Sequence, residues 1–312
     1  MKIIARISNG IGNQMFLYAS AFSIAKKLNR VLELDISSGI DSMLKKNKNK
    51  VFKNLDLKYE LNIFNISSRI TSKENTFNNF YKYLLRKILL IEDKFRIKKN
   101  FILEHEDKDK NTSFISNFDN SELKDKVYIE GYFESEKYFN DYRKEIIKEF
   151  TLKKKIDCFE PFEKKINNSE SVSICIRANR FNERETDDLD KSNIFMSQEF
   201  EKQQYQYILR GIEYLNTKIN NPQFYLFSDD INKISHLFDS VKNITLINKF
   251  KNNKIHEDYF LMSKCKHHIV SPTTFHFWPA WLSEYENKIC TKPINLNSSK
   301  NCDYWPLKWV GL

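Results

Sequence analysis

A short apolar run in the middle of the chain, Val172–Ile176, constrains the fold more than any other stretch. A β-branched run without polar alternation is typical of a strand buried on both faces of a parallel sheet. The run ends abruptly at Arg177, and Arg180 and Arg184 follow among asparagines. Because ligands of open α/β sheets bind beyond the carboxyl ends of the strands, a guanidinium cluster there suits an anion such as phosphate. A surface loop of solvated arginines is the alternative that this stretch leaves open.

Two further predicted strands of the C-terminal half, Phe224–Phe227 and His268–Val270, also end in polar residues. The first strand is followed by Ser228, Asp229 and Asp230. The second is followed by Ser271, Thr273, Thr274 and Phe275, where a helix begins. A hydroxyl-rich helix start is an ordinary N-cap, but it is also an anion site, because N–H groups converge where the helix dipole is positive. Three such strand ends in one half resemble a nucleotide crevice.

The N-terminal half opens with a predicted strand, a glycine turn and a helix. Lys2–Ile7 is the strand, Gly10 and Gly12 lie in the turn, Met15–Leu28 has a helical pattern, and Val31–Asp35 is the next strand. This arrangement places backbone N–H groups and a positive dipole end at a small site. The third glycine of the dinucleotide fingerprint is missing, and glycines that serve only a tight turn are the alternative.

Strand and helix alternation through the C-terminal half predicts a doubly wound α/β sheet. The further predicted elements are helices at Glu199–Lys218, His256–Cys265 and His276–Glu284 and a strand at Ile244–Ile247. A chain of 312 residues, 41% hydrophobic, favours two domains over one. The polar stretch Lys153–Ser171 is the candidate hinge, which gives domains at 1–160 and 161–312.

The formal net charge of +10 favours polyanionic partners: nucleic acid, an anionic membrane surface or a phosphorylated substrate. The basic residues are scattered in short runs, however, which argues against a nucleic-acid stripe. The 5 cysteines are irregularly spaced without a C-x-x-C pair, which is typical of a reducing compartment and argues against a zinc site. With neither a signal-peptide pattern nor an apolar run long enough to span a membrane, we expect a cytoplasmic protein that contacts membranes at most by its surface.

Several stretches together resemble the α-1,2-fucosyltransferase family, glycosyltransferase family 11. Gly10–Ala19 is similar to the family signature G-L-G-N-Q-M-F-x-Y-A, and Gly131–Phe139 to G-Y-W-Q-S-E-K-Y-F. Phe224–Asp230 matches the family's strand with S-D-D, and Asp258–His267 with Ser271–Leu282 is similar to D-L-x-L-M-S-x-C-K-H and N-S-T-F-S-W-W-G-A-W-L. Order and spacing hold from Met1 to about Leu282, so the resemblance covers nearly the whole chain.

The resemblance implies a GT-B architecture, with two Rossmann-like domains facing a central cleft and the sugar nucleotide held mainly by the C-terminal one. It implies GDP-fucose as donor substrate, no required cofactor or metal, and inverting transfer to a galactose 2-hydroxyl of a surface-glycan precursor of the O-antigen or capsule kind. Such an acceptor can be lipid-linked, which would place the enzyme at the inner face of the membrane through peripheral contact.

The resemblance also assigns site residues. Arg177 would neutralise charge on the departing diphosphate, and Asn13 would reach the sugar or acceptor from the opposite wall. The predicted donor-binding set is Gly10, Gly12, Gln14, Arg180, Ser228, Asp229, Asp230, Ser271, Thr273, Thr274 and Phe275, of which all but Arg180 rest on the resemblance.

The family pattern H-x-R-R-x-D is altered in this chain. Cys175 replaces the histidine, Ala178 the second arginine and Arg180 the aspartate, and we expect Arg180 to supply the charge lost at Ala178. The same fold with a different sugar-nucleotide donor is therefore one alternative. A metal-dependent glycosyltransferase is another, because Asp229-Asp230 follows a predicted strand and could hold Mg²⁺ or Mn²⁺.

Overall fold

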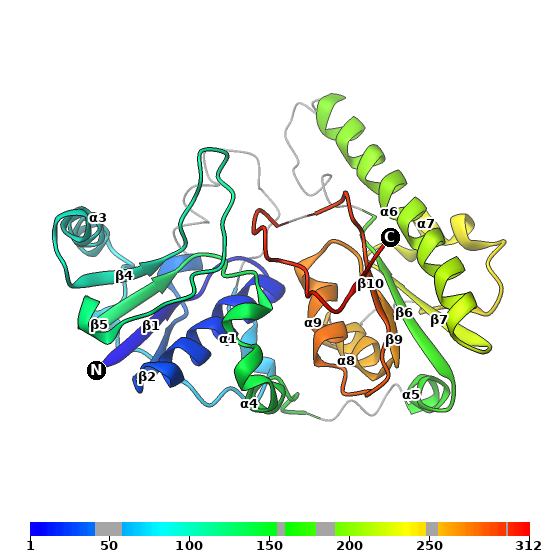
Figure 1. Cartoon of the computed structure of the whole chain (residues 1–312), viewed down its shortest axis with the longest axis horizontal. Helices are drawn as coiled ribbons and strands as arrows, with labels where there is room; N and C mark the ends of the chain where they lie inside the picture. The colour runs from blue at the N-terminus through cyan, green and yellow to red at the C-terminus, as the bar shows by residue number, and fades with distance from the viewer. Residues whose placement is uncertain (41–57, 155–159, 179–190, 248–254, 298) are drawn as a thin grey trace. The chain divides into compact units, whose positions relative to one another are not determined.

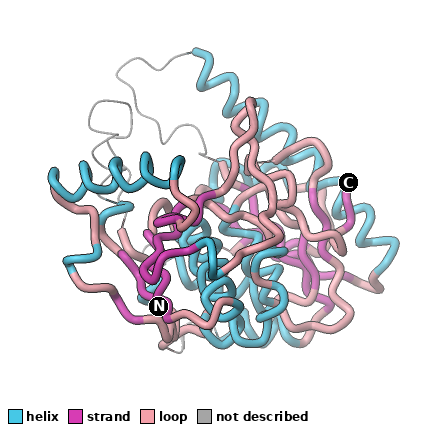
Figure 2. The backbone as a smooth tube through the Cα atoms, turned by 60° about the vertical axis from the view of Figure 1, so that its left-hand side comes forward, coloured by secondary structure: helices cyan, strands magenta, loops and turns pink. Residues whose placement is uncertain are grey.

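The computed structural model describes residues 1–40, 58–154, 160–178, 191–247, 255–297 and 299–312. They divide into two compact units (Figure 1). The first runs to Lys153 and takes in Ser299–Pro306, and the second comprises Lys154–Ser298 and Leu307–Leu312. Helices and strands alternate along the chain in both units, and Figure 2 distinguishes the two kinds of element by colour. The predicted α/β class is thereby confirmed, whereas the GT-B arrangement and the division at residue 160 stay predictions.

The first unit carries a parallel sheet in the order β3-β2-β1-β5-β4. The strands are β1 (Lys2–Arg6), β2 (Val31–Asp35), β3 (Arg69–Ile70), β4 (Lys99–Leu103) and β5 (Leu123–Glu130). β1 lies at the centre, with Ile3 opposite Leu32 on one side and Val127 on the other. Ile3 is fully buried, as expected of a strand covered on both faces.

Helices and short turns connect these strands. Helix α1 (Ile11–Lys27) leads from β1 to β2 and is buried along nearly its whole length. Helix α3 (Phe80–Phe95) lies between β3 and β4 in the chain, and α4 (Arg143–Glu149) follows β5. Single 3₁₀ turns, η1 to η5, occupy Leu61–Ile63, Lys73–Asn75, Asn120–Glu122, Glu136–Tyr138 and Asn140–Tyr142.

The second unit carries a parallel sheet in the order β11-β10-β9-β6-β7-β8. Its strands are β6 (Glu170–Ile176), β7 (Pro222–Ser228), β8 (Ile244–Leu246), β9 (His267–Ile269), β10 (Cys290–Lys292) and β11 (Val310–Gly311). Its helices are α5 (Glu160–Asn167), α6 (Lys191–Lys218), α7 (Ile231–Ile234), α8 (Ile255–Lys264) and α9 (Thr274–Leu282), with a 3₁₀ turn, η7, at Ser235–Phe238.

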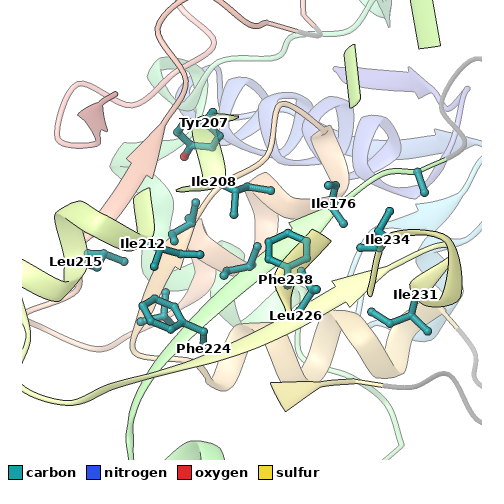
Figure 3. Close-up of a cluster of buried hydrophobic side chains, with 14 of the residues drawn as sticks. Ile176, Tyr207, Ile208, Ile212, Leu215, Phe224, Leu226, Ile231, Ile234 and Phe238 are labelled. Carbon is teal, nitrogen blue, oxygen red and sulfur yellow. The ribbon is translucent and has the colours of Figure 1, made fainter. Parts of the chain in front are cut away.

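Strand β6 is buried on both faces, as its apolar run predicts. Ile174 and Ile176 point into a cluster with Tyr207 and Ile208 of α6 and Leu226 of β7 (Figure 3). On the opposite face, a second cluster combines Cys175 with Tyr225 and Phe227 of β7 and with Leu261, Met262 and Cys265 around α8. Helices therefore cover both faces, which leaves the edges and the strand ends for binding.

A C-terminal segment, Ser299–Pro306, belongs to the first unit. The Tyr304 ring is fully buried there, with its centroid 5.9 Å from that of Phe16 in α1. The Asn301 side-chain amide donates to Glu104 over 3.1 Å, and Asp303 forms an ion pair with Lys137. The first unit thus contains residues from both ends of the chain.

Two local expectations need correction. The sequence pattern predicts a helix over Ser135–Phe150, with Tyr138, Tyr142, Ile146 and Ile147 on one side, but the structure breaks this stretch into η4, η5 and α4. Tyr138 and Phe139 are both buried, and the chain leaves the helical region at Phe139, which has φ at −135°. The predicted glycine turn is also shorter than expected, because α1 begins at Ile11 and takes in Gly12. Asn9 is the residue with left-handed backbone here, with φ at 65°, whereas Gly10 has φ at −77°.

Candidate functional site

Three polar strand ends lie side by side at the carboxyl edge of the second sheet. β6 lies between β9 and β7 in the sheet. Ile176 at the end of β6 is opposite Ser228 at the end of β7, and Ile174 is opposite Ile269 at the end of β9. Because all three strands are parallel, Arg177, Asp229 and the segment after Ile269 leave the sheet at the same edge. The structure thus brings together polar groups that lie far apart in the sequence.

Arg177 and Asp229 face one another across this edge. The Arg177 Nε atom lies 4.0 Å from Oδ2 of Asp229, with the side chains 38% and 32% exposed. The other carboxylate oxygen, Oδ1, accepts the Ala178 N–H over 2.7 Å and the Ser228 hydroxyl over 3.3 Å. Asp229 therefore fixes the backbone directly after Arg177 while it balances the guanidinium charge. Both side chains remain accessible from solvent.

Two residues that the sequence analysis did not single out also position Arg177. Gln204 of α6 is fully buried, and its amide accepts from the Arg177 N–H over 3.3 Å and donates to the Arg177 carbonyl over 3.4 Å. Lys233 of α7 donates to the Ala178 carbonyl over 2.7 Å and pairs with Glu201 over 2.9 Å. Hydrogen bonds to the main chain from three elements thus hold the exit of β6. In the sequence, the one sign of a special role for Gln204 is that it is a polar residue within the apolar stripe of α6.

Asp230 has a local structural role. Its carboxylate is the N-cap of α7 and accepts the Lys233 N–H over 3.2 Å, while its own N–H donates to the Ser228 hydroxyl over 3.1 Å. These hydrogen bonds shape the turn after β7 and hold Asp229 in place. Contact of Asp230 with a nucleotide stays a prediction.

Helix α9 begins directly after the third strand end. Thr273 is its N-cap, and the Thr273 hydroxyl accepts the His276 N–H over 3.2 Å. Ser271 and Thr273 are buried, whereas Thr274 and Phe275 in the first turn are partly exposed. Any contact of α9 with a dissolved anion therefore goes through the first-turn residues and their N–H groups. The helix begins at Thr274, two residues before the predicted start at His276. Pro279 therefore lies in its second turn and not in its first.

A buried hydrogen-bond chain ties the start of α9 to β6 and β9. The His276 Nδ1 atom accepts the Ser271 N–H over 3.1 Å, so the neutral ring carries its hydrogen on Nε2. That Nε2 lies 3.1 Å from the Ser173 hydroxyl, which lies 2.7 Å from Nδ1 of His268. Ser173 accepts from His276 and donates to His268. Burial lowers the pKa of His276 to about 3 and the pKa of His268 well below its ordinary value, so both rings are neutral.

In the first unit, the predicted site residues lie at the start of α1. Asn13 is partly exposed, and Gly10 is exposed. A Cβ at position 10 would meet no atom within 4 Å, so neither crowding nor backbone conformation requires glycine there. Gly12 is a buried residue of the first turn of α1.

Gln14 differs from its neighbours because it is fully buried. Its amide donates to the carbonyls of Asn9 and Lys58 over 2.8 and 2.7 Å and accepts the Glu60 N–H over 3.0 Å. These contacts fasten the segment at Lys58–Glu60 to α1. A contact between Gln14 and the donor stays a prediction.

A charged cluster lies at the carboxyl edge of the first sheet, where β1, β2 and β5 end in Arg6, Asp35 and Glu130. Glu130 pairs with both Arg6 and Arg86. The Arg6 side chain also donates to Ser38, which in turn donates to Asp35. The cluster links α3 to the strand ends. Asp35, which closes the predicted strand Val31–Asp35, was its indication in the sequence.

Arg180 lies outside the described residues. So does Asp188-Leu189-Asp190, which has the letters of an acidic D-x-D motif but follows no apolar strand, so the sequence favours a solvated loop there. Within the described ranges, no group of three or more histidine, cysteine or carboxylate side chains could hold a metal ion. The same ranges include no helix that is long and apolar enough to cross a bilayer.

Comparison with known proteins adds a family. The sequence model of glycosyl transferase family 11 matches residues 3–312. An alpha-1,2-colitosyltransferase of Escherichia coli is 28% identical, over 99% of this chain and 98% of that protein. The O-antigen biosynthesis glycosyltransferase WbnK of Escherichia coli is 26% identical, over 96% and 98% of the two chains.

Solved structures with a related chain path include the fucosyltransferase NodZ from Bradyrhizobium. It has a TM-score of 0.45 and 11% identity, covering 89% of this chain and 91% of that one. A FUT1 mutant of Arabidopsis thaliana in complex with GDP has a TM-score of 0.46 and 12% identity, covering 94% and 71%.

Proposed function

The chain belongs to glycosyl transferase family 11, and we propose that within this family of glycosyltransferases it transfers fucose from GDP-fucose to a galactose 2-hydroxyl. The acceptor would be a surface-glycan precursor of the O-antigen or capsule kind, because a relative over nearly the whole chain is an O-antigen biosynthesis glycosyltransferase. In this proposal the two units form a GT-B enzyme. The second unit holds the sugar nucleotide, and the first unit, through Asn13 and the start of α1, contributes to the acceptor side.

The observation that supports donor binding best is the meeting of three strand ends around Arg177. In a single displacement, the galactose hydroxyl attacks the anomeric carbon, its proton passes to a general base, and the bond to GDP breaks. Negative charge then accumulates on the departing diphosphate. Arg177 can neutralise it with a fork of donors that match phosphate oxygens, and the first-turn N–H groups of α9 add a positive dipole end. Since Asp229, Gln204 and Lys233 fix the backbone around Arg177, this stabilisation would be preorganised.

A second donor, nucleotide-activated colitose, is the alternative that one observation favours. The 28% identical relative is a colitosyltransferase, and the family motif is altered at Cys175, Ala178 and Arg180. Colitose is fucose without its 3-hydroxyl. A site built to hydrogen-bond a hydroxyl rejects the analogue that lacks it by large factors, whereas a purely apolar pocket discriminates weakly. The ratio of kcat/KM for the two donors therefore decides between them.

The test is a donor panel, with transfer to a galactoside acceptor measured for GDP-fucose, GDP-colitose and sugar nucleotides with other bases. We expect GDP-fucose to give the highest kcat/KM. A higher kcat/KM for GDP-colitose would show that colitose is the sugar transferred. Activity with a uridine sugar nucleotide alone would refute the assignment of guanosine as the base. The metal-dependent alternative is tested by EDTA, which should leave the rate unchanged.

The role of Arg177 is tested by Arg177→Lys. We expect kcat to fall by about 10²-fold or more, because a point charge cannot replace the fork at a developing charge. Arg210→Lys is the matched control, since Arg210 is exposed on α6 of the same unit, and it should keep the wild-type rate. Equal rates for the two variants would contradict the proposed catalytic role.

A further inference from the structure

Helix α3 turns its apolar side away from the unit to which it belongs. Seven large apolar residues lie within about 140° of the helix circumference at 100° per residue, and each is between 47% and 83% exposed. We call them the apolar arc: Phe80, Tyr81, Leu84, Leu85, Ile88, Ile91 and Phe95. The helix includes no buried residue. In an ordinary surface helix the apolar stripe faces the core instead.

The opposite side of α3 is fixed to the first unit. Arg86 pairs with Glu130 of β5, and the Asp93 carboxylate accepts the N–H groups of Asn100 and Phe101, both over 2.9 Å. Leu89 and Leu90 pack on a core cluster that includes Phe101. These contacts come from the middle and the end of the helix, so α3 cannot roll to bury the apolar arc without breaking them. Figure 1 shows the helix nearly end-on, beside β4.

The exposed apolar surface is larger than a soluble monomer usually has. With about 200 Å² for each fully exposed side chain, the apolar arc offers roughly 900 Å², against about 300 to 600 Å² for the largest patch of a typical monomer. An exposed apolar surface of this size is typical of a site that binds a protein or a membrane. Ile97, directly after the helix, is 83% exposed and extends the patch.

The charges beside the apolar arc identify the partner. Between Phe80 and Lys99 the chain has seven basic and two acidic residues. Both acidic residues are engaged, since Asp93 accepts backbone N–H groups and Glu92 pairs with Arg96 and Lys124. Exposed Lys87 and Lys94 lie along the side of the arc. A second copy of this chain would bring like charges together, whereas an anionic lipid surface complements both the charge and the apolar face.

We propose that α3 is a membrane-docking helix, which lies in the plane of an anionic bilayer with its apolar arc among the acyl chains and its basic residues at the lipid headgroups. Its 16 residues form a helix of about 24 Å, which is too short to span a bilayer. This inference gives the peripheral membrane contact a specific element. It rests on the surface of α3 and on neither the donor nor the acceptor.

The test is flotation of the full chain with vesicles of neutral phosphatidylcholine, alone or with 30% phosphatidylglycerol, at 0.1 M salt. We expect binding to the anionic vesicles, weaker binding to the neutral ones and a loss of binding at 0.5 M salt. The double variant Leu84→Glu and Ile88→Glu should weaken binding at least tenfold. Its matched control is Ile294→Glu with Leu307→Glu, because these aliphatic residues are 67% and 87% exposed elsewhere on the chain; this control should bind like wild type.

Two flotation results would overturn the proposal: no binding of the wild type to anionic vesicles, or equal loss of binding in both double variants. A dimer in light scattering that Leu84→Glu with Ile88→Glu abolishes would also overturn it, in favour of a second copy as the partner. Donor hydrolysis without vesicles should be the same in all three proteins, because α3 is separate from the proposed donor residues in the sequence and in its contacts. Failure to dock and failure of the proposed transferase activity can thus be told apart.

Discussion

Mild acid should destabilise the second unit through the neutral histidine pair, His268 and His276. Both rings are buried, and the hydrogen bonds through Ser173 assign each ring one N–H donor and one bare nitrogen. Protonation would place a hydrogen on Nδ1 of His276, where the Ser271 N–H already points. The unfolded chain, in contrast, binds a proton freely near pH 6.5.

The size of this effect follows from the two pKa values. Burial lowers the folded pKa of His276 to about 3, so below pH 6.5 the unfolded state binds more protons than the folded state. Stability is therefore fully present above pH 6.5 and is lost as the pH falls below it. At pH 5.5 the loss is about 1.4 kcal/mol for each fully shifted histidine, or about 3 kcal/mol for the pair. A domain with a total stability of about 5 to 15 kcal/mol should show this clearly.

Urea unfolding at pH 7.5 and 5.5, followed by tryptophan fluorescence, measures the effect, because Trp278, Trp281 and Trp309 belong to the second unit. In His276→Asn, the side-chain oxygen can still accept the Ser271 N–H. The difference in unfolding free energy between pH 7.5 and pH 5.5 should then be about 1.4 kcal/mol smaller than in the wild type. The exposed His236 provides the control, since His236→Asn should keep the wild-type difference. An undiminished pH difference in His276→Asn would refute the reasoning.

Substitutions at three further positions test other parts of the structure. Gly10→Ala should cost at most about 1 kcal/mol of stability, because a Cβ there meets no atom within 4 Å, yet raise KM if a ligand approaches this backbone; an unchanged KM would remove Gly10 from the site. Gln204→Leu should lower kcat more than it raises donor KM, because it releases the backbone of Arg177, and Gln204→Glu, which can still accept the N–H, should restore part of the rate; equal kcat in all three proteins would show that Gln204 only fills space. Burial alone would raise the pKa of Glu33, but hydrogen bonds from Thr71, Lys2 and Arg69 bring it to about 2. In Glu33→Gln, the loss of unfolding free energy between pH 5 and 3.5 should therefore be about 1 kcal/mol smaller than in the wild type. Urea unfolding at these two pH values measures this difference.

Strands could be predicted from the sequence where an apolar run ends in a polar or glycine-rich stretch. The bounds of β2 agree with the prediction residue by residue, and β6 is buried on both faces as its β-branched run predicts. The meeting of the three strand ends also follows from the sequence, because parallel strands with helical crossovers end at the same edge.

Other features depend on contacts that local patterns do not encode. Gln204 contacts Arg177 from 27 residues away, and a glutamine within a helix gives no indication of its partner. The helical pattern of Ser135–Phe150 is broken at Phe139, which has φ at −135°, and nothing in the local pattern indicates this break. The amphipathic pattern around Phe77–Ile91 predicts a helix, which the structure has as α3. Only the contacts of Arg86 and Asp93 show that its apolar side faces outward.

The membership of Ser299–Pro306 in the first unit has a consequence for how the chain matures during synthesis. Tyr304 fills space beside Phe16, and Asp303 and Asn301 bind side chains of the same unit. While the ribosome is still making the second unit, the first one lacks these residues and leaves their sites open to water. Although domains generally fold in order of synthesis, here the half translated first can complete its packing only after Ser299–Pro306 has been synthesised.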